Sequence, residues 1–234
     1  MANSYFDFKH FRINQQDCNM KVCTDSCLFG AWAASEIQSF ENSRLLDIGT
    51  GTGLLSLMIA QQNSLIKIDA IEIEKKDALQ AANNVSESVF AKKINVINED
   101  IKTFNSDIKY DNIICNPPFF SNSLLSPDVD KNTAKHQSEL DLKTLINISK
   151  NLLKPTGDFF LLMPYVRYNE IISEIRNISK MVKVRPHSNK DFFRIMLKFS
   201  DRNSCLQESE ISIKENGEYT EEFKILLKNF YLDF

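Results

Sequence analysis

Hydrophobic and polar positions divide this chain into two parts that meet near residue 44. In the first part, residues 5–13 alternate apolar and polar side chains for most of their length, which predicts an extended strand. A second short strand near residues 19–22 is expected to lie beside it. Residues 26–34 are rich in Leu, Phe, Ala and Trp and predict a buried helix, for which Thr24 and Asp25 offer an N-cap.

After residue 44, short apolar runs alternate with longer segments of helical periodicity. Strands are predicted at residues 45–48, 66–73, 94–98, 111–115 and 158–163, and helices at 54–62, 75–88, 141–153 and 168–179. This alternation is typical of a doubly wound α/β fold with a mostly parallel sheet. In the helix at 75–88, the side chains expected to face the core are Ala78, Leu79, Ala82 and Val85.

The last part of the chain departs from this alternation. Residues 182–185 and 192–199 are predicted to pair as a terminal hairpin, and a strand at 209–214 and a helix at 221–230 follow. At 234 residues, with 43% hydrophobic and 25% charged side chains, the chain is long enough for one sizeable core. We therefore expect a single domain at 1–234, in which an extension at 1–43 packs on a core at 44–200 and residues 201–234 add a strand and a helix.

The chain start and the cysteines bear on where the protein works. The first residues lack the charged start and apolar run of a signal peptide, and no apolar stretch is long enough to span a bilayer, so we expect a cytoplasmic protein without membrane contact. Five cysteines are an odd and sparse set, which favours free thiols. Cys18, Cys23 and Cys27 could hold a metal, but no C-x-x-C pair or fourth ligand accompanies them, and we expect no metal.

One segment concentrates positive charge, although the net charge of -3 argues against a surface that is basic throughout. Within residues 180–198 the basic side chains are Lys180, Lys183, Arg185, Lys190, Arg194 and Lys198, against the single acid Asp191. Phe192 and Phe193 lie among them. This basic strip suits a polyanion if a nucleic-acid substrate is supported by other residues. The alternative is a solvated edge hairpin whose charges discourage aggregation.

A long polar connection at residues 120–137 interrupts the compact pattern. Loops of this length are often lids or binding loops, and Lys131, Lys135 and His136 could face an anionic ligand here. The alternative interpretation is disorder in the free protein.

A glycine-rich turn, Asp47-Ile48-Gly49-Thr50-Gly51-Thr52-Gly53, connects the strand at 45–48 to the helix at 54–62. Glycines allow a tight turn and let the backbone lie against a ligand, in the crevice where doubly wound sheets bind nucleotides. A dinucleotide site would require a glycine where this chain has Leu54. The acid Asp47 ahead of the turn can instead meet an ammonium group, which a pyrophosphate lacks.

Two further acids follow the next strands. Glu72 can accept hydrogen bonds from both hydroxyls of a ribose, with Glu74 as a less favoured competitor, and Asp100 can accept one from an adenine amino group. Ammonium, ribose and adenine together describe S-adenosyl-L-methionine. The residues expected to bind it are Asp47, Gly49, Thr50, Gly51, Gly53, Glu72, Ile73, Asp100, Ile101 and Asn116. The alternative is that these acids only cap helices or face solvent.

Asn116-Pro117-Pro118-Phe119 follows the apolar run at 111–115. Consecutive prolines have fixed φ and no N–H, so this backbone is stiff and its carbonyls are unpaired by any strand ladder. An amide, rigid carbonyls and an aromatic ring together suit a planar group that carries N–H donors. A proline-broken loop at a strand end is the alternative.

The order of these motifs, with D-x-G-x-G-x-G first and N-P-P-F last, resembles the class I methyltransferases that modify amino or amide nitrogens. The resemblance narrows to the bacterial tRNA1(Val) (adenine(37)-N6)-methyltransferases through Phe6-x-Phe8-Lys9-x-Phe11, Met20-Lys21-Val22-x-Thr24-Asp25, Leu28-x-Gly30-Ala31-Trp32-Ala33 and Phe230-Tyr231-Leu232. It covers nearly the whole chain and implies a Rossmann-like sheet of seven strands, with the cofactor and the chemistry in the core at 44–200. Cys23 and Ser26 depart from it, because glycines are expected at both positions.

This resemblance implies transfer of a methyl group to the exocyclic N6 of an adenine, adenine 37 of tRNA1(Val). Asn116 Oδ1 and the Pro117 carbonyl would accept the amine protons, and Phe119 would stack on the base. The implied partner is the tRNA anticodon stem-loop, bound by a monomer. The side chains expected to bind RNA are Lys183, Arg185, Lys190 and Arg194, with Arg12 and Lys135 as weaker candidates.

Two other functions fit some of the same residues. The N-P-P-aromatic site could hold a glutamine side-chain amide, which would make the chain a protein methyltransferase that acts on a translation factor. A cofactor-binding RNA chaperone without transferase activity is the third possibility, and the intact Asp47, Glu72 and Asn116 argue against it.

Overall fold

The computed structural model describes residues 3–117, 140–174, 177–200, 202 and 205–234. Its main sheet consists of β3 (Arg44–Ile48), β4 (Lys67–Glu72), β5 (Ile94–Asn98), β6 (Tyr110–Cys115), β7 (Leu153–Pro164), β8 (Ile178–His187), β9 (Arg194–Ser200), β10 (Gln207–Glu215) and β11 (Glu218–Tyr219). The strands lie in the order β11-β10-β8-β9-β7-β6-β3-β4-β5.

Most neighbouring strands in this sheet are parallel. From β7 through β6, β3 and β4 to β5 every pair is parallel, and β10 is parallel to β8. Only β9, which lies between β7 and β8, and the short β11 run antiparallel to their neighbours within the described sheet. The expected doubly wound α/β fold is confirmed, but the sheet has nine strands within the described residues instead of seven. The hairpin of β8 and β9 is not terminal, because β10 covers its outer edge.

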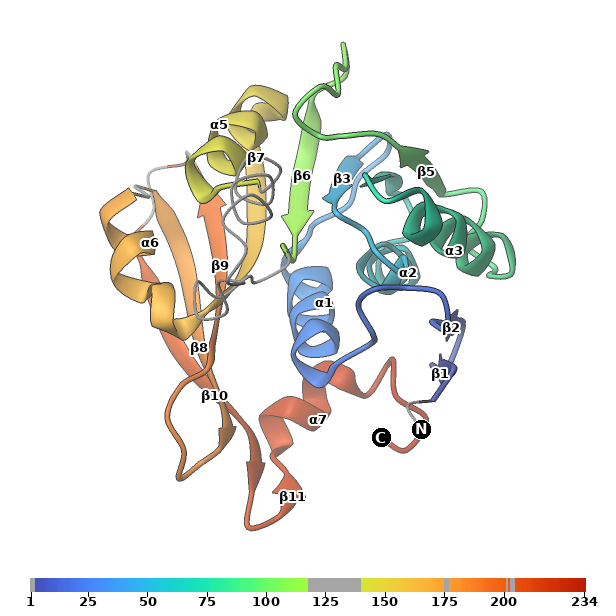
Figure 1. Ribbon diagram of the computed structural model, residues 1–234. Coiled ribbons are helices and arrows are strands. Elements are labelled where there is room, and N and C mark those ends of the chain that lie inside the picture. The colour runs from blue at the N-terminus through green and yellow to red at the C-terminus, as the bar shows by residue number, and fades with distance from the viewer. Residues whose placement is uncertain (1–2, 118–139, 175–176, 201, 203–204) are drawn as a thin grey trace, which may run out of the picture.

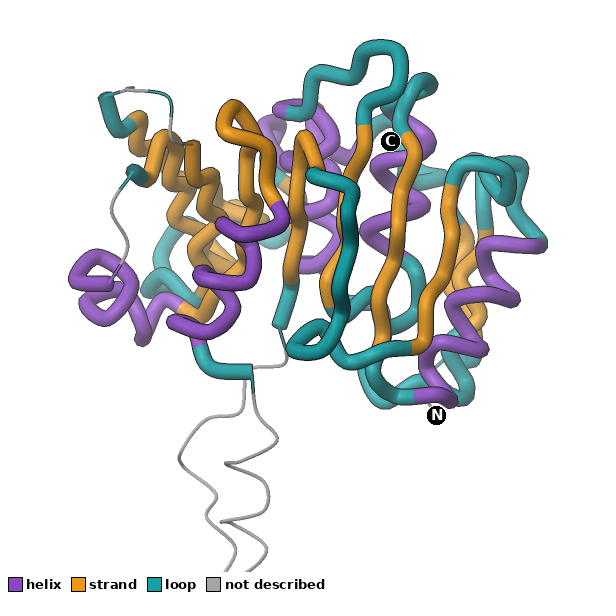
Figure 2. The backbone as a smooth tube through the Cα atoms, turned by 90° about the horizontal axis from the view of Figure 1, so that it is seen from above, coloured by secondary structure: helices purple, strands orange, loops and turns teal. Residues whose placement is uncertain are grey.

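Helices pack on both faces of the sheet, as Figure 2 shows. The helices are α1 (Thr24–Glu36), α2 (Leu54–Gln62), α3 (Lys75–Ser86), α5 (Leu142–Leu152), α6 (Tyr168–Glu174) and α7 (Glu221–Leu227), with a 3-10 turn at Tyr165–Arg167. Successive residues of a strand point to opposite faces, so Leu45 joins the core beneath α1, α2 and α7, whereas Leu46 joins the core beneath α5 and α6.

Helix α1 is buried on all sides. Each residue from Ser26 to Ala34 is buried, which agrees with the apolar composition that predicted this helix. The expected N-cap at Thr24 and Asp25 is wrong: the helix begins at Thr24, and Cys23 is the N-cap without a side-chain hydrogen bond. Figure 1 places α1 below the end of β6 and above α7, so it connects the sheet to the C-terminal segment.

The N-terminal segment forms a hairpin, not the single strand predicted at 5–13. Strands β1 (Tyr5–Asp7) and β2 (Arg12–Asn14) pair antiparallel, and the rings of Phe8 and Phe11 stack in the turn between them, 4.5 Å apart. Residues 19–22 form no strand, so that prediction is also wrong. Period-two alternation continues through a tight turn, and therefore it did not reveal the reversal of the chain.

Aromatic side chains join the two ends of the described chain. The ring of Phe6 lies 5.6 Å from that of Tyr231, and Lys9 Nζ donates to the Phe234 carbonyl over 2.7 Å. The Lys9 amide also donates to the Phe230 carbonyl over 2.8 Å.

Two details of the predicted helices are wrong. Ile178 and Ser179 belong to β8, and α6 ends before them. In α3 the exposed fraction of Leu79 is 57%, and Ala82 is exposed as well, whereas Ala81 is buried. The buried face of α3 carries Ala81 and Asn84 instead, and Asn84 donates to the carbonyls of Asn14 and Thr52.

Replacement of Phe223 on α7 tests how firmly the C-terminal segment is packed. Phe223 is fully buried against Tyr219, Tyr231 and Phe234, so Phe223→Ala should lower the free energy of unfolding by ~3–5 kcal/mol. The matched control is Ile225→Ala on the same helix, where the side chain is 61% exposed and a change within about 0.5 kcal/mol is expected. Urea titrations of both variants measure the difference, and equal losses would contradict it.

Candidate functional site

Three parallel strands bring the predicted site residues to one edge of the sheet. Ile48 at the end of β3 is paired with Ile71 of β4 on one side and with Cys115 of β6 on the other. The residues that follow these strands therefore gather at the carboxyl edge, where open α/β sheets bind their ligands. In Figure 1 the end of β6 lies directly above α1.

The glycine turn after β3 has the backbone that its composition predicts. Gly49, Gly51 and Gly53 have φ of 71°, 56° and 84°, values that favour glycine. Apart from the adjacent residues, no heavy atom of the described chain lies within 4 Å of the place that a Cβ would take on Gly49 or Gly51. The turn is tied to β4, because the Gly49 and Thr50 amides both donate to the Ile71 carbonyl. It thus presents open backbone beside the strand ends.

Asp47 is fully buried on β3, and only one of its oxygens is satisfied. Oδ2 accepts hydrogen bonds from Thr50 Oγ1 and Ser56 Oγ, each 2.7 Å long. Oδ1 has no hydrogen-bond partner among the described residues. Burial raises the pKa of Asp47 to about 6, and the two hydroxyls only partly oppose this. The arrangement is suited to a cationic ligand group that would meet Oδ1.

Glu72 at the end of β4 lies next to the glycine turn. Its Oε2 accepts the Gly51 amide over 2.9 Å, and its Oε1 accepts the Glu74 amide over 3.0 Å. Burial raises the pKa of Glu72, while these backbone hydrogen bonds oppose the shift. Each oxygen keeps a second lone pair, so the carboxylate can still accept two hydroxyl groups.

The remaining residues predicted to bind the cofactor line the same edge farther along. Ile73 is 55% exposed directly after Glu72. Asp100 is half-buried, and its Oδ1 accepts the Lys102 amide over 2.9 Å, which shapes the turn after β5. Ile101 is buried among the side chains beneath α5, so only a small part of its side chain is accessible to a ligand.

Asn116 follows β6 and is bonded to α1. Its Nδ2 donates to Ser26 Oγ over 2.9 Å, and its Oδ1 is buried without a partner in the part of the chain that the structure describes. Pro117 is half-buried beside it. Phe119 and the loop at 120–137, with Lys131, Lys135 and His136, lie outside the described residues.

The predicted basic strip is largely paired with acids from other elements. Lys183 Nζ lies 3.0 Å from Glu208 Oε2, and Arg185 Nη2 lies 2.6 Å from Glu210 Oε2, both on the neighbouring strand β10. Arg194 Nε donates to Asp25 Oδ2 over 2.7 Å. The strip therefore carries less free positive charge than its sequence indicates.

The other two described candidates for RNA binding differ from each other. Lys190 is exposed in the turn between β8 and β9. Arg12 lies in the N-terminal hairpin, where it pairs with Asp7 over 2.6 Å and stacks on the ring of Tyr5. The structure thus does not join Arg12 to the strip on β8 and β9.

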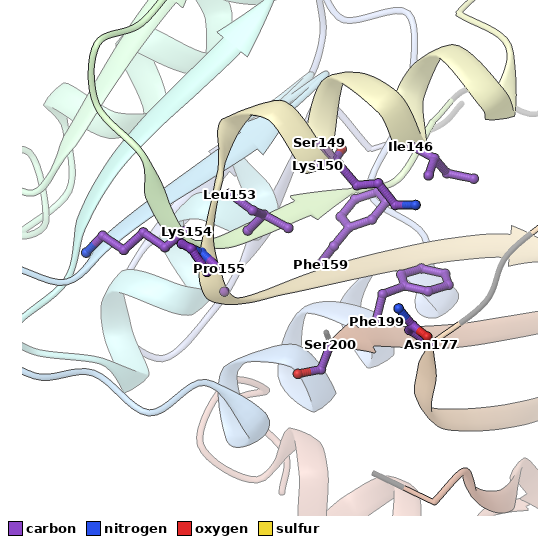
Figure 3. Close-up of a pocket in the computed structure, with 11 residues that line it drawn as sticks. Ile146, Ser149, Lys150, Leu153, Lys154, Pro155, Phe159, Asn177, Phe199 and Ser200 are labelled. Carbon is purple, nitrogen blue, oxygen red and sulfur yellow. The ribbon is translucent and has the colours of Figure 1, made fainter. Parts of the chain in front are cut away.

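A cavity of about 190 Å³ lies elsewhere, between α5 and the strands β7 and β9 (Figure 3). Its described lining includes Ser149, Phe159 and Phe199 but none of the predicted site residues. In the described ranges, no three His, Cys, Asp or Glu side chains are grouped as a metal site would require. Likewise, no described helix is long and apolar enough to cross a membrane.

Sequence reasoning missed two hydroxyls of the site. Ser56 binds Asp47, and a lone serine within the apolar run of α2 was a usable signal for it. Ser26 entered the sequence analysis only as a departure from an expected glycine. Its hydrogen bond with Asn116 joins residues that are 90 positions apart in the sequence. No local pattern indicates a contact of that kind.

Known proteins resemble this chain over nearly its whole length. A family model described as the methyltransferase small domain matches residues 32–187. The tRNA1(Val) (adenine(37)-N6)-methyltransferase of Dyadobacter fermentans is 39% identical, with 99% of each chain covered. The chain belongs to the tRNA1(Val) (adenine(37)-N6)-methyltransferase family. The protein of the same name from Parabacteroides distasonis is 38% identical, with 99% of each chain covered. The one from Aliivibrio fischeri is 37% identical, with 97% of each chain covered.

Family membership confirms the resemblance found in the motifs. It also confirms that the chain is an enzyme that uses S-adenosyl-L-methionine to transfer methyl groups. Solved structures agree on the fold. A predicted O-methyltransferase from Agrobacterium tumefaciens has a TM-score of 0.66 at 15% identity, with 87% of this chain and 95% of that chain covered. The methyltransferase subunit of a type I restriction-modification system from Streptococcus thermophilus has a TM-score of 0.60 at 13% identity, with 91% and 52% covered.

The buried carboxyl of Asp47 should make stability depend on pH. Its pKa is about 6 in the folded chain against an ordinary 3.8, so the folded state holds the proton more tightly and loses stability as the pH rises between these values. Asp47→Asn removes this titration. The free energy of unfolding of the variant minus that of the wild type should therefore rise by about 2.4 kcal/mol between pH 4 and pH 7. Urea titrations across this range measure it, and a constant difference would contradict the assignment.

Proposed function

We propose that this chain methylates the exocyclic N6 of an adenine in the anticodon loop of a tRNA, with adenine 37 of tRNA1(Val) as the expected target. The observation that carries the proposal is the buried Oδ1 of Asn116, which has no partner among the described residues and lies at the strand edge that also carries the glycine turn. The names of the relatives support the same substrate.

The described residues fit S-adenosyl-L-methionine, which supplies a methyl group on a sulfonium when bound. Asp47 Oδ1 lacks a partner within the described chain and would meet the ammonium group, and the open backbone at Gly49 and Gly51 would lie against the ligand. Glu72 would accept the ribose hydroxyls. The other residues that would bind this cofactor are Thr50, Gly53, Ile73, Asp100, Ile101 and Asn116.

Asn116 and Pro117 would act on the amine that receives the methyl group. The adenine amine is a weak nucleophile, because its lone pair is delocalised into the ring. Asn116 Oδ1 and the Pro117 carbonyl would each accept one N–H and favour a tetrahedral nitrogen. As positive charge develops on this nitrogen, both acceptors bind it more strongly than in the ground state, which lowers the barrier. The role of Phe119 as a stacking ring stays a prediction.

The protein-glutamine alternative shares the Asn116 site, but none of the relatives named above carries such a name. A chaperone without transferase activity would not need a buried amide oxygen that the described residues leave without a partner beside the strand edge. The cytoplasmic location, the monomeric state and the division of the chain into 1–43, 44–200 and 201–234 stay predictions.

Incubation with labelled S-adenosyl-L-methionine and unmodified total tRNA tests the main proposal. We expect label in N6-methyladenosine, whereas label in protein would favour the glutamine alternative and no label would favour the chaperone. Asn116→Ala should lower kcat on the order of 100- to 1,000-fold, since it removes an acceptor that acts in the transition state. Affinity for S-adenosylhomocysteine, measured by calorimetry, should fall far less, by at most about tenfold, because Asp47, Glu72 and the glycine turn would still hold the cofactor.

Asn83→Ala is the matched control for this substitution, because Asn83 is exposed on α3. Wild-type rates are expected there. Full activity of Asn116→Ala would show that another residue accepts the amine protons.

The proposed RNA surface includes Lys183, Arg185, Lys190 and Arg194. Because Glu208 and Glu210 pair with two of these side chains, RNA phosphates must compete with carboxylates. Removing the two acids should therefore strengthen binding, and reversing the charge at the exposed Lys190 should weaken it.

The double variant Glu208→Gln, Glu210→Gln should raise tRNA affinity roughly 2- to 10-fold, the range that two exposed ion pairs allow. Lys190→Glu should lower affinity and reduce the slope of log K against log salt by about 1. Filter binding at several salt concentrations measures both effects. Glu222→Gln on α7 is the control, and an equal gain from it would point to net charge instead of this surface.

A further inference from the structure

Ser26 on α1 holds the amide of Asn116 across a long stretch of sequence. Asn116 Nδ2 donates to Ser26 Oγ over 2.9 Å, and Ser26 is only 5% exposed. Within the described residues, Asn116 Oδ1 is buried and has no partner. The amide is therefore tied at its nitrogen and open at its oxygen.

Several contacts keep the Ser26 hydroxyl itself in place. Cys23 Sγ lies 2.9 Å from Ser26 Oγ. Asp25 accepts the Arg194 guanidinium over 2.7 Å, which ties the first turn of α1 to β9. After Ser26, α1 stays buried for about two further turns, up to Ala34. The hydroxyl is thus a fixed point to which the amide of Asn116 is attached.

The orientation of that amide decides whether Asn116 can serve the proposed transfer. An amide has an acceptor at one end and donors at the other, and an adenine amine presents donors. Only the orientation with Oδ1 open can accept from the amine, because the reversed amide would place donors against donors. We infer that Ser26 is a positioning residue that selects the productive orientation of Asn116. The inference rests on the proposed function and concerns a hydroxyl that an expected glycine would lack.

Ser26→Ala and Ser26→Gly separate this role from a merely structural one. Ser26→Ala leaves Nδ2 without its acceptor while the methyl group keeps water out, so kcat should fall on the order of 10- to 100-fold. KM for tRNA and affinity for S-adenosylhomocysteine should not change. Ser26→Gly leaves room for a water molecule that accepts from Nδ2, and kcat should stay within about threefold of the wild-type value.

A structural role of Ser26 would reverse this order. Glycine forms helices less readily than alanine, so a loss caused by a weakened α1 would be larger in Ser26→Gly than in Ser26→Ala. Ser35→Ala on the same helix is the control, because Ser35 is exposed in the last turn of α1 and its hydroxyl donates to the Trp32 carbonyl. Wild-type kcat is expected there.

A second measurement does not depend on the reaction. In the ¹⁵N–¹H spectrum, the side-chain amide of Asn116 is assigned by its loss in Asn116→Ala. Its protons should exchange with water at least about tenfold faster in Ser26→Ala than in the wild type, because the amide then turns freely. If the wild type methylates no tRNA, the proposed function fails, whereas this exchange rate still decides whether Ser26 holds the amide. Unchanged exchange in Ser26→Ala, an unchanged kcat, or a larger loss in Ser26→Gly would overturn the inference.

Discussion

The burial of α1 against the sheet is the constraint on which the site depends. Every residue of α1 from Ser26 to Ala34 is buried, and the close packing of its unequal side chains, together with the ion pair of Asp25 and Arg194, holds its first turn in a fixed position. Gly30 allows α1 to approach α2 closely, since a Cβ there would lie 2.7 Å from Met58 Sδ. Both helices pack on the same face of the sheet, and each directs one serine at a strand end: Ser26 at Asn116 and Ser56 at Asp47.

The same edge of the sheet carries polar groups that the chain alone does not satisfy. Burial raises the pKa of both Asp47 and Glu72, and the charge of Glu72 raises that of Asp47 further. Two acceptor atoms, Asp47 Oδ1 and Asn116 Oδ1, find no partner in the described part of the molecule. Folding thus fixes acceptors in advance, and a ligand that brings donors or positive charge meets them without rearrangement.

Sequence reasoning succeeded where a local pattern carries the information. The bounds predicted at 54–62 and 94–98 are those of α2 and β5, because a strong apolar run and clear turn residues define each. The positive φ of the glycine turn was likewise readable from its composition. The pairing of Lys183 and Arg185 with Glu208 and Glu210 could not be predicted in this way, because a parallel crossover brings β10 beside β8 from a later segment of the chain. Counting charges within one segment therefore overstated its positive potential.

The contact between the two ends of the described chain has a consequence for biosynthesis. Lys9 and Phe6 find their partners at Phe234 and Tyr231, so these contacts cannot form until nearly all of the sequence has left the ribosome. Contacts between such distant positions also close late in folding, because the loop entropy must be lost first. Until then the N-terminal hairpin cannot make its contacts with the aromatic cluster around α7. The parallel strands β3 to β7 all precede residue 165, whereas the N-terminal hairpin reaches its final place only after Tyr231 and Phe234 have been synthesised.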